Sequence, residues 1–363
     1  MATATVRISA LTRQYPLSDL LTIRLPLALL LALPILAPAL FPTSRLLSLA
    51  VTAAIYVIVA NGLHIIFSYA GQLSLAHTAL WGVGAYTAAL LSVHYGLPTP
   101  VLIPAAAAAG ALGAVAIGIP AFRTAGFSFA IITFAFAEIL RTVANNWSSL
   151  TEGSTGVTVF DPPSALGSIQ FETFDHLPNF YHLTLGLAYL SLAAIFLIRQ
   201  SSLGRGFIAI RENEALARSV GINVYVHKLL AFAISGAFAG VAGALLVYHQ
   251  KHIEPGPLSP FSAFGTVQFL LMILIGGRFS MLGPAVGAVI AVFMPEIIEA
   301  GFGDILDPAR VQIIFGVGLV LTVLYSPNGV AGQTSSNFRR FAGLVRHLTP
   351  RKAGAGAGDG GKS

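Results

Sequence analysis

Long apolar stretches separated by short polar ones dominate this chain. A run of about 20 mostly apolar residues is long enough for an α-helix to cross the hydrocarbon core of a bilayer. The pattern recurs about ten times and predicts an all-α, polytopic integral membrane protein. The predicted spans lie near residues 25–42, 46–66, 79–96, 101–121, 126–144, 180–198, 229–248, 263–277, 283–299 and 311–326.

The composition agrees with a membrane protein. Charged residues make up 9% of the 363 residues and hydrophobic residues 55%, whereas a typical soluble domain carries about 25% charged residues. A soluble protein with so few charges could not cover its surface with them. The net charge is +6, but the basic residues are scattered between apolar runs, so they do not form a nucleic-acid-binding patch. The absence of cysteine excludes disulfides and thiolate chemistry.

The distribution of Lys and Arg predicts how the spans are oriented. Cytoplasmic loops of membrane proteins carry an excess of these residues. With the N-terminus in the cytoplasm and ten alternating spans, 16 of the 20 Lys and Arg residues fall on the cytoplasmic side. The reverse orientation inverts this ratio, so we expect both termini to be cytoplasmic. The outer side then holds Arg45, Arg141, Lys251 and Arg310.

The order of spans and loops divides the chain into three parts. We expect residues 1–24 to form a cytoplasmic N-terminal segment and residues 25–332 to form the transmembrane domain. Within that domain, residues 145–179 are predicted to be an extracytoplasmic polar loop and residues 199–228 a cytoplasmic loop. Residues 333–363 form a basic and then glycine-rich tail, a composition typical of a disordered segment.

The tail ends in a pattern that looks like a phosphate-binding loop. Residues 356–363 match G-x-x-x-x-G-K-[ST] and also contain G-x-G-x-x-G. Both patterns bind phosphate where a strand precedes them and a helix follows them. Here a Gly/Ala tract precedes the pattern and the sequence stops at Ser363. We therefore interpret it as a flexible tail and expect that this chain does not itself hydrolyse ATP.

The cytoplasmic loop contains a short amphipathic segment. Residues 208–220 are predicted to form one helix, with Ile210, Ala217 and Val220 on one side. Gly221 follows at the position of a C-terminal cap, where glycine is favoured because it adopts the left-handed conformation easily. An ordinary solvated loop is the alternative, but such a loop does not require an alanine-rich face beside charges.

One motif in this segment resembles a known coupling element. Glu214-Ala215-Leu216-Ala217 followed by Gly221 resembles the EAA motif of permease subunits in ABC importers. In that family the short helix docks on an ATPase subunit and passes the ATP-driven movement to the spans. The resemblance implies this ATPase-coupling role for Glu214, Ala215, Ala217 and Gly221.

Further blocks in the same order resemble the branched-chain amino-acid permease family. The resemblance covers residues 61–332 and is closest to the LivM-type subunit, which has a similarly long middle loop and an extra N-terminal span. Several ordered blocks that match one family are more specific than any single motif. The blocks are residues 61–91, 126–157, 211–246, 275–288 and 326–332.

The resemblance also implies partners and a location. A second, homologous permease subunit, two cytoplasmic ATPase subunits and an extracytoplasmic substrate-binding protein are expected to complete the importer. ATP and Mg²⁺ are expected on the ATPase subunits, so no cofactor is expected in this chain, which is not expected to be an enzyme. The implied location is the bacterial cytoplasmic (inner) membrane, as a multi-pass protein.

Polar side chains between two glycines mark a candidate translocation path. Gln72, Ser74 and His77 lie in the glycine-flanked stretch 71–84 and predict a broken or re-entrant helix. Such backbone is tolerated in membranes where it lines a cavity. These side chains either border the substrate path or tie helices together by hydrogen bonds. His77 has no second ligand at metal-binding spacing, so we expect no metal site.

Two charged residues lie within the predicted fifth span. Glu138 and Arg141 are three residues apart, so helix geometry places them on one side. They either line the path or form a mutual ion pair near the outer interface. Glycine-rich patterns at 236–240 and 283–287 predict close contacts between helices. No Ser/His/Asp set or pair of carboxylates indicates a catalytic site.

Three other functions are compatible with parts of this pattern. Relatives within the same superfamily carry urea or short amides, and the motifs do not distinguish these substrates from branched-chain amino acids. An ion-coupled secondary transporter has a similar number of spans but needs no ATPase partner. A membrane enzyme or scaffold is disfavoured because the sequence contains no catalytic cluster.

Overall fold

The computed structural model describes the chain over four long stretches. These are residues 44–124, 126–159, 177–256 and 263–302, together with the short segments 165–166 and 169–170 and the single residues Pro38 and Gly316. The predicted spans 25–42 and 311–326, the segment 1–24 and the tail 333–363 lie outside these stretches or touch them at one residue.

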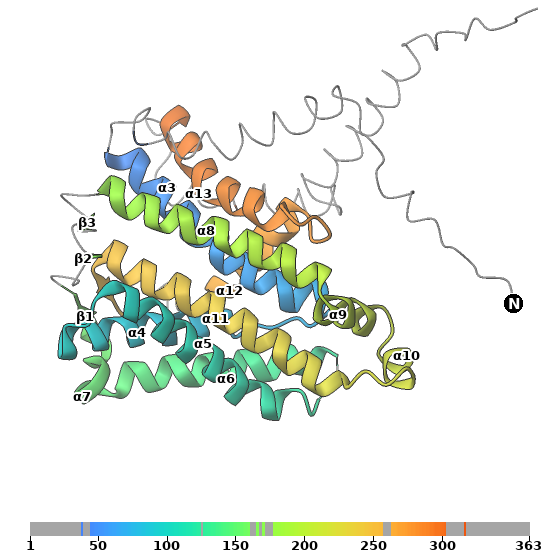
Figure 1. Ribbon diagram of the computed structural model, residues 1–363. Helices are drawn as coiled ribbons and strands as arrows, with labels where there is room; N and C mark the ends of the chain where they lie inside the picture. Colours follow the sequence, from blue (N-terminus) through green and yellow to red (C-terminus); the bar gives the residue numbers. More distant parts are fainter. Residues whose placement is uncertain are drawn as a thin grey trace, which may run out of the picture.

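The predicted spans that fall on described residues are all helices (Figure 1). Five of the helical segments in the described stretches are long and apolar enough to cross a membrane: 45–69, 99–121, 127–146, 177–200 and 224–250. The all-α, polytopic architecture is therefore confirmed. The helices are α3 (Ser44–His64) with its π-helical continuation η3 (Ile65–Tyr69), α4 (His77–Tyr95), α5 (Thr99–Ala121), α6 (Phe127–Asn146), α8 (Leu177–Gln200), α11 (Val224–Gln250), α12 (Ala263–Gly276) and α13 (Gly283–Phe302).

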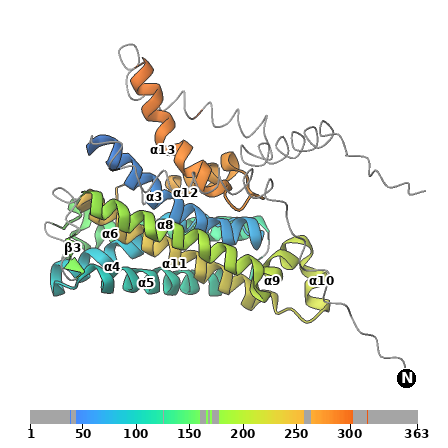
Figure 2. The ribbon, with the colours of Figure 1, turned by 45° about the horizontal axis from the view of Figure 1, so that its top comes forward.

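The helices run roughly side by side and leave their connections at two ends (Figures 1 and 2). One end carries two short helices, α9 (Ser202–Glu212) and α10 (Glu214–Ser219), and we call it the α10 end. The opposite end carries a two-stranded sheet in which β1 (Val157–Thr158) pairs antiparallel with β4 (His252–Ile253). We call this the β1 end.

The connection predicted as a polar loop, 145–179, contains short regular elements. After α6 come α7 (Ser148–Thr151), the 3₁₀ helix η4 (Gly153–Thr155) and β1, and further on β2 (Ala165–Leu166) pairs with β3 (Ile169–Gln170). The pairing of β1 with β4 joins this connection to the one that follows α11. Both connections therefore lie at the same end, as the alternating topology predicts.

The basic residues separate between the two ends as the orientation prediction requires. Arg45, Arg141 and Lys251 lie at the β1 end or in the helical turns next to it. The other described Lys and Arg residues lie at the α10 end. The positive-inside rule predicts that the α10 end faces the cytoplasm. The residues at the α10 end are Arg123, Arg199, Arg205, Arg211, Arg218, Lys228 and Arg278.

Helix α11 lies at the centre of the bundle and packs closely on α4 and α5. A Cβ atom at Gly240 would clash with the backbone of Ala106, and one at Gly84 would clash with Gly240. Lipid tails are as apolar as leucine, so membrane helices associate through such close packing and not through the hydrophobic effect. The close contacts predicted for 236–240 are confirmed.

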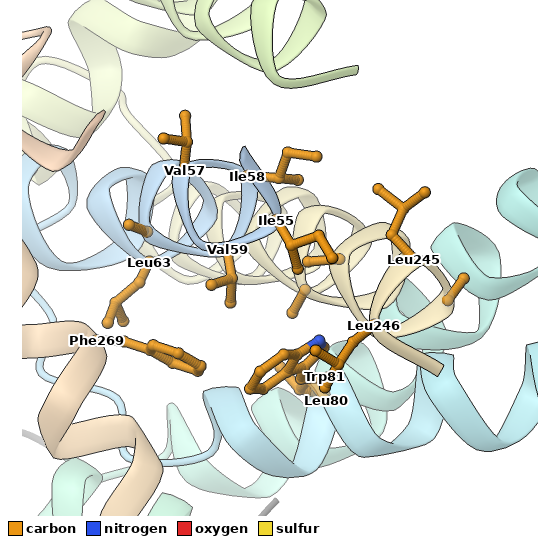
Figure 3. Close-up of a cluster of buried hydrophobic side chains, with 14 of the residues drawn as sticks. Ile55, Val57, Ile58, Val59, Leu63, Leu80, Trp81, Leu245, Leu246 and Phe269 are labelled. Atoms are coloured by element: carbon orange, nitrogen blue, oxygen red, sulfur yellow. The ribbon is translucent and has the colours of Figure 1, made fainter. Parts of the chain in front are cut away.

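The glycines of 283–287 act in the same way between α12 and α13. A Cβ atom at Gly287 would overlap the carbonyl of Met272, and one at Gly276 would overlap Gly283. Large side chains fill the centre of the bundle around Trp81, whose ring is 5.0 Å from that of Phe269 (Figure 3). Small residues thus set the helix spacing, and large ones fill what remains.

Helix α3 does not continue directly into α4. It ends in the π-helix η3, in which the Ala70 amide donates to the Ile65 carbonyl over 3.1 Å. Residues 70–76 then form neither helix nor strand, and α4 begins at His77. The broken helix predicted within 71–84 is therefore present, although the break ends at 76 and most of that stretch is helical.

Candidate functional site

The loop predicted to be cytoplasmic, 199–228, folds as two helices and not as the single helix 208–220 that the pattern predicts. Asn213 separates α9 from α10 in an extended conformation, with φ −159° and ψ 106°. Its side-chain oxygen accepts a hydrogen bond from the Leu216 amide over 3.0 Å. Asparagine is favoured at this N-cap position because it satisfies an amide that the helix leaves unpaired. The single-helix prediction is wrong because this local hydrogen bond starts a new helix.

One side of the loop is packed against the start of α11. Ile210 and Ala217 form a small apolar cluster with Val224, and each of the three side chains is at most 4% exposed. The prediction is wrong for Val220, which is 70% exposed. The break at Asn213 changes the direction of the chain, so Val220 no longer shares a face with Ile210.

Gly221 ends α10 as the sequence predicts. Its φ of +87° lies in a region that side chains disfavour, and its amide donates to the Arg218 carbonyl over 3.0 Å. The Ile222 amide reaches back to the Ala217 carbonyl, also over 3.0 Å. This backward hydrogen bonding at a left-handed residue is a common way to satisfy the last carbonyls of a helix.

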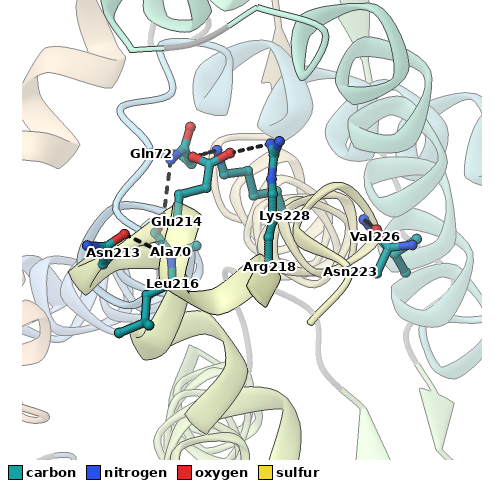
Figure 4. A network of polar contacts seen from close by, with 9 residues as sticks. All are labelled: Ala70, Gln72, Asn213, Glu214, Leu216, Arg218, Asn223, Val226 and Lys228. Carbon is teal, nitrogen blue, oxygen red and sulfur yellow. Dashed lines mark hydrogen bonds and ion pairs between the residues drawn. The ribbon is translucent and has the colours of Figure 1, made fainter. Parts of the chain in front are cut away.

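Glu214 joins α10 to α11 (Figure 4). Its Oε2 accepts from Lys228 Nζ over 2.8 Å, and its Oε1 accepts from Arg218 Nη2 over 2.9 Å. Burial of the Glu214 carboxyl opposes its ionisation, but the hydrogen bonds from Lys228 and Arg218 outweigh this and lower its pKa. Lys228 is 8% exposed and was not singled out from the sequence, because its partner lies fourteen residues away across a turn.

The break at 70–76 is held by hydroxyl groups from two other helices. The Leu75 amide donates to Thr133 Oγ1 of α6 over 3.0 Å. Thr266 of α12 accepts from the Thr78 amide over 3.1 Å and donates to the Leu75 carbonyl over 3.2 Å. The break therefore has partners for backbone groups that a continuous helix would satisfy internally.

His77, at the first position of α4, links three helices. Its Nε2 lies 2.6 Å from Ser235 Oγ of α11, and Ser235 Oγ donates to the Gly62 carbonyl of α3 over 2.6 Å. Because a hydroxyl has one hydrogen, Ser235 accepts from His77, and His77 carries its proton on Nε2. The described contacts of His77 therefore match the hypothesis that it ties helices together by hydrogen bonds.

Ser74 and Gln72 lie on the same break but differ in exposure. Ser74 is fully buried, and its Oγ accepts from the Ala76 amide over 3.3 Å. Gln72 is partly exposed, and its Nε2 donates to the Ala70 carbonyl over 3.4 Å. Gln72 is the polar side chain of the break that is open to solvent or a ligand.

Glu138 and Arg141 lie towards the β1 end, away from the α10 end. Arg141 Nε donates to Glu138 Oε1 over 2.9 Å, and Nη1 donates to the Pro255 carbonyl over 3.1 Å. The predicted ion pair is therefore present, and it ties α6 to the connection after α11. The structure does not place this pair with α9 and α10, so the sequence candidates form separate sites.

Metal binding has no support in the described part of the chain. Within it, no group of three or more His, Asp or Glu side chains is arranged to hold a metal ion. The chemistry of the described residues is that of helix contacts, a buried polar break and a charged loop.

Comparison with known proteins identifies the family. Residues 45–324 match the family model described as "Branched-chain amino acid transport system / permease component". The chain is 28% identical over 351 residues to the high-affinity branched-chain amino acid transport system permease protein LivM of Salmonella typhimurium, with 91% of this chain and 80% of the relative covered. LivM of Escherichia coli K12 is 29% identical over 338 residues, covering 87% and 77%.

A more distant relative bears a related name. The permease protein LivH of Salmonella typhimurium is 26% identical over 296 residues, covering 77% of this chain and 91% of the relative. No solved structure shows a significant match to the chain. The family model covers most of the chain, including the break, the loop and the central helix. This multi-pass membrane protein therefore belongs to the family of permease components of branched-chain amino acid transport systems.

Proposed function

We propose that this chain is one of two permease subunits of an ATP-driven importer for branched-chain amino acids, with α10 as the helix that docks on an ATPase subunit. One observation carries the proposal. Leu216 on α10 and Val220, the residue that follows α10, have exposed fractions of 62% and 70%. Glu214 and Ala217 bind the other side of α10 to α11. A short helix with one exposed apolar side and one side bound to α11 is suited to dock on another subunit and to transmit that subunit's movement to α11.

The anchoring explains how movement at α10 reaches the membrane. Lys228 lies in the first turns of α11, and its ion pair with Glu214 links α10 directly to that helix. Further along, α11 packs on α4 and α5 through Gly240. A displacement of α10 by an ATPase subunit is therefore passed to the central helix of the bundle, as alternating access requires.

The remaining parts of the proposal follow from the family. The substrate-binding protein delivers the amino acid at the β1 end, and two cytoplasmic ATPase subunits bind ATP and Mg²⁺ at the α10 end. This chain contributes no cofactor site and hydrolyses nothing itself. The assembly lies in the bacterial cytoplasmic membrane, where the second permease subunit completes the path.

Docking is tested by variants of α10 in the co-expressed complex. Burial of a leucine side chain contributes about 1.5–3 kcal/mol, so Leu216→Gln is expected to weaken ATPase association about tenfold or more. Glu214→Arg is expected to lower both co-purification and transport, because it replaces the ion pair with repulsion from Lys228. Leu203→Gln on α9, where the leucine is 38% exposed, is the matched control. Unchanged co-purification and transport in both α10 variants would refute the docking assignment.

The substrate and energy source are tested in cells. Uptake of labelled leucine is expected to fall when this chain is deleted and to return when it is restored. Uptake is also expected to stop when ATP is depleted and to continue when the ion gradient is collapsed. Dependence on the gradient alone would indicate a secondary transporter, and unchanged leucine uptake would make labelled urea and short amides the next substrates to measure.

A further inference from the structure

The end of α3–η3 is capped by a side chain from the cytoplasmic loop. The last carbonyls of a helix have no partner within the helix. Arg211, near the end of α9, donates from Nη1 to the Ser68 carbonyl over 2.7 Å. A cation at this place also interacts favourably with the negative end of the helix dipole. The loop therefore supplies the cap of a membrane helix that precedes it by more than a hundred residues.

The aliphatic part of the same side chain packs on the start of the break. Gly71 has a φ of +70°, and a Cβ atom there would lie 2.7 Å from Arg211 Cγ. Both the backbone conformation and the closeness of Arg211 require glycine at this position. Arg211 is thus in contact with both the last turn before the break and its first residues.

A third element meets Arg211 at the turn between α12 and α13. The Arg211 guanidinium lies 5.4 Å from the centre of the Phe279 ring. Arg278 lies over the same ring at 4.7 Å and over Phe67 of η3 at 5.2 Å. Such cation–π contacts are stabilising at this range, so α9, η3 and the α12–α13 turn meet around one guanidinium.

The helix end that Arg211 caps contains costly features. It is π-helical, a form that is rare and occurs mostly as single turns. Both ring nitrogens of His64, Ser68 Oγ and the Tyr69 hydroxyl are buried and have no hydrogen-bond partner in the described stretches. Each unpaired buried polar group raises the energy of this arrangement. This helix end is therefore less stable than one in which these groups are paired.

We propose that Arg211 is a positioning residue that transmits movement of the α9–α10 unit to η3 and the break at 70–76. The inference rests on the proposed function, in which an ATPase subunit moves α10. This route is separate from the Glu214–Lys228 pair, which passes movement to α11. Arg211 makes the conformation of the break depend on the position of the loop.

The transport test uses the complete importer in proteoliposomes with labelled leucine. Arg211→Gln is expected to lower leucine transported per ATP hydrolysed about tenfold, because it removes a charge-assisted hydrogen bond. Arg211→Lys is expected to give an intermediate ratio, since lysine keeps the charge but not the planar fork. Arg205→Gln is the matched control, because Arg205 lies on the same helix and bonds only the nearby Gln200 carbonyl in the described stretches. An unchanged ratio in Arg211→Gln, or in Arg211→Lys if the first variant does not assemble, would overturn the proposal.

A second readout follows the break itself. The chain has no cysteine, so Gln72→Cys provides the single site on this chain that a maleimide can label. We expect its labelling rate to change on ATP addition in the otherwise unaltered complex and in Arg205→Gln, to change less in Arg211→Lys, and not to change in Arg211→Gln. A full response that persists in Arg211→Gln, or in Arg211→Lys if the first variant does not assemble, would overturn this inference alone. The absence of any response in the unaltered complex, together with wild-type behaviour of Leu216→Gln, would overturn the proposed function and this inference with it.

Discussion

The hydroxyl of Thr266 is predicted to stabilise the break between α3 and α4. The substitution Thr266→Val removes this hydroxyl and nearly preserves the shape of the side chain. Thr266 is fully buried on α12, and its Oγ1 accepts from the Thr78 amide and donates to the Leu75 carbonyl. It also lies 2.9 Å from the Thr78 hydroxyl. One side chain thus serves three polar groups around the break.

The expected loss of unfolding free energy depends on which buried polar groups the substitution leaves without a hydrogen-bond partner. An interhelical side-chain hydrogen bond in a membrane contributes about 0.6 kcal/mol on average. A buried backbone group left without a partner costs about 1–3 kcal/mol. The second figure applies here, because Thr78 is the second residue of α4 and its amide has no acceptor within the helix. We expect Thr266→Val to lower the free energy of unfolding by about 1–3 kcal/mol.

Thr184→Val is the matched control. Thr184 is equally buried, but its hydroxyl donates over 2.8 Å only to the Phe180 carbonyl of its own helix among the described residues. That carbonyl keeps its backbone partner after the substitution. The control is therefore expected to lower the free energy of unfolding by less than about 0.6 kcal/mol.

The assay uses tryptophan fluorescence during unfolding in mixed detergent micelles. The chain contains two tryptophans, so a Trp147→Phe background leaves Trp81 as the reporter. Trp81 follows Thr78 by one helical turn, and Phe269, 5.0 Å from its ring, follows Thr266 by one turn. The reporter therefore senses the same α4–α12 contact. Equal losses of unfolding free energy in the Thr266 and Thr184 variants would refute the role of Thr266.

Two further predictions concern packing and pH. Gly240→Ala is expected to disrupt α11 packing, because the added Cβ would overlap the Ala106 backbone, and size-exclusion chromatography should then show no folded, monodisperse protein. Gly186→Ala on α8 is the control and is expected to behave like the unaltered chain, because a Cβ there meets open space. Equal behaviour of the two variants would refute the packing argument. Because the pKa of Glu214 is lowered, its ion pair with Lys228 is present at neutral pH and is lost as the pH falls below 4.5, the usual pKa of a glutamate. Hydrogen exchange of the α10 amides, compared at matched intrinsic exchange rates, should therefore increase below that pH. The same increase in Glu214→Gln would contradict this explanation.

The helices could be predicted from the sequence because each apolar run specifies its own span. Lipid contacts require length and hydrophobicity, and both are local properties of the chain. The predicted spans within the described stretches are helices for this reason. The Glu138–Arg141 pair was also predictable, since residues three apart on a helix are neighbours.

The candidate site was predictable only in its local parts. Gly221 ends α10 because a left-handed residue favours glycine. The break at Asn213 was missed, although asparagine followed by an acidic residue is an N-cap signal that could have revealed it. Lys228 and Arg211 were missed for a different reason: their partners, Glu214 and Ser68, are reached only through the folded chain.

The all-helical membrane architecture, the order of the spans and the segregation of basic residues between two ends could all be predicted before the fold was known. These follow from hydrophobicity and charge along the chain, which do not depend on distant partners. How the backbone of the break at 70–76 finds its hydrogen-bond partners, and which elements hold α9 and α10, depends on contacts that form only in the folded chain. Those outcomes depend on Thr133, Thr266 and Arg211, which come from other helices, and the geometry of helix packing alone brings their polar groups within hydrogen-bond range.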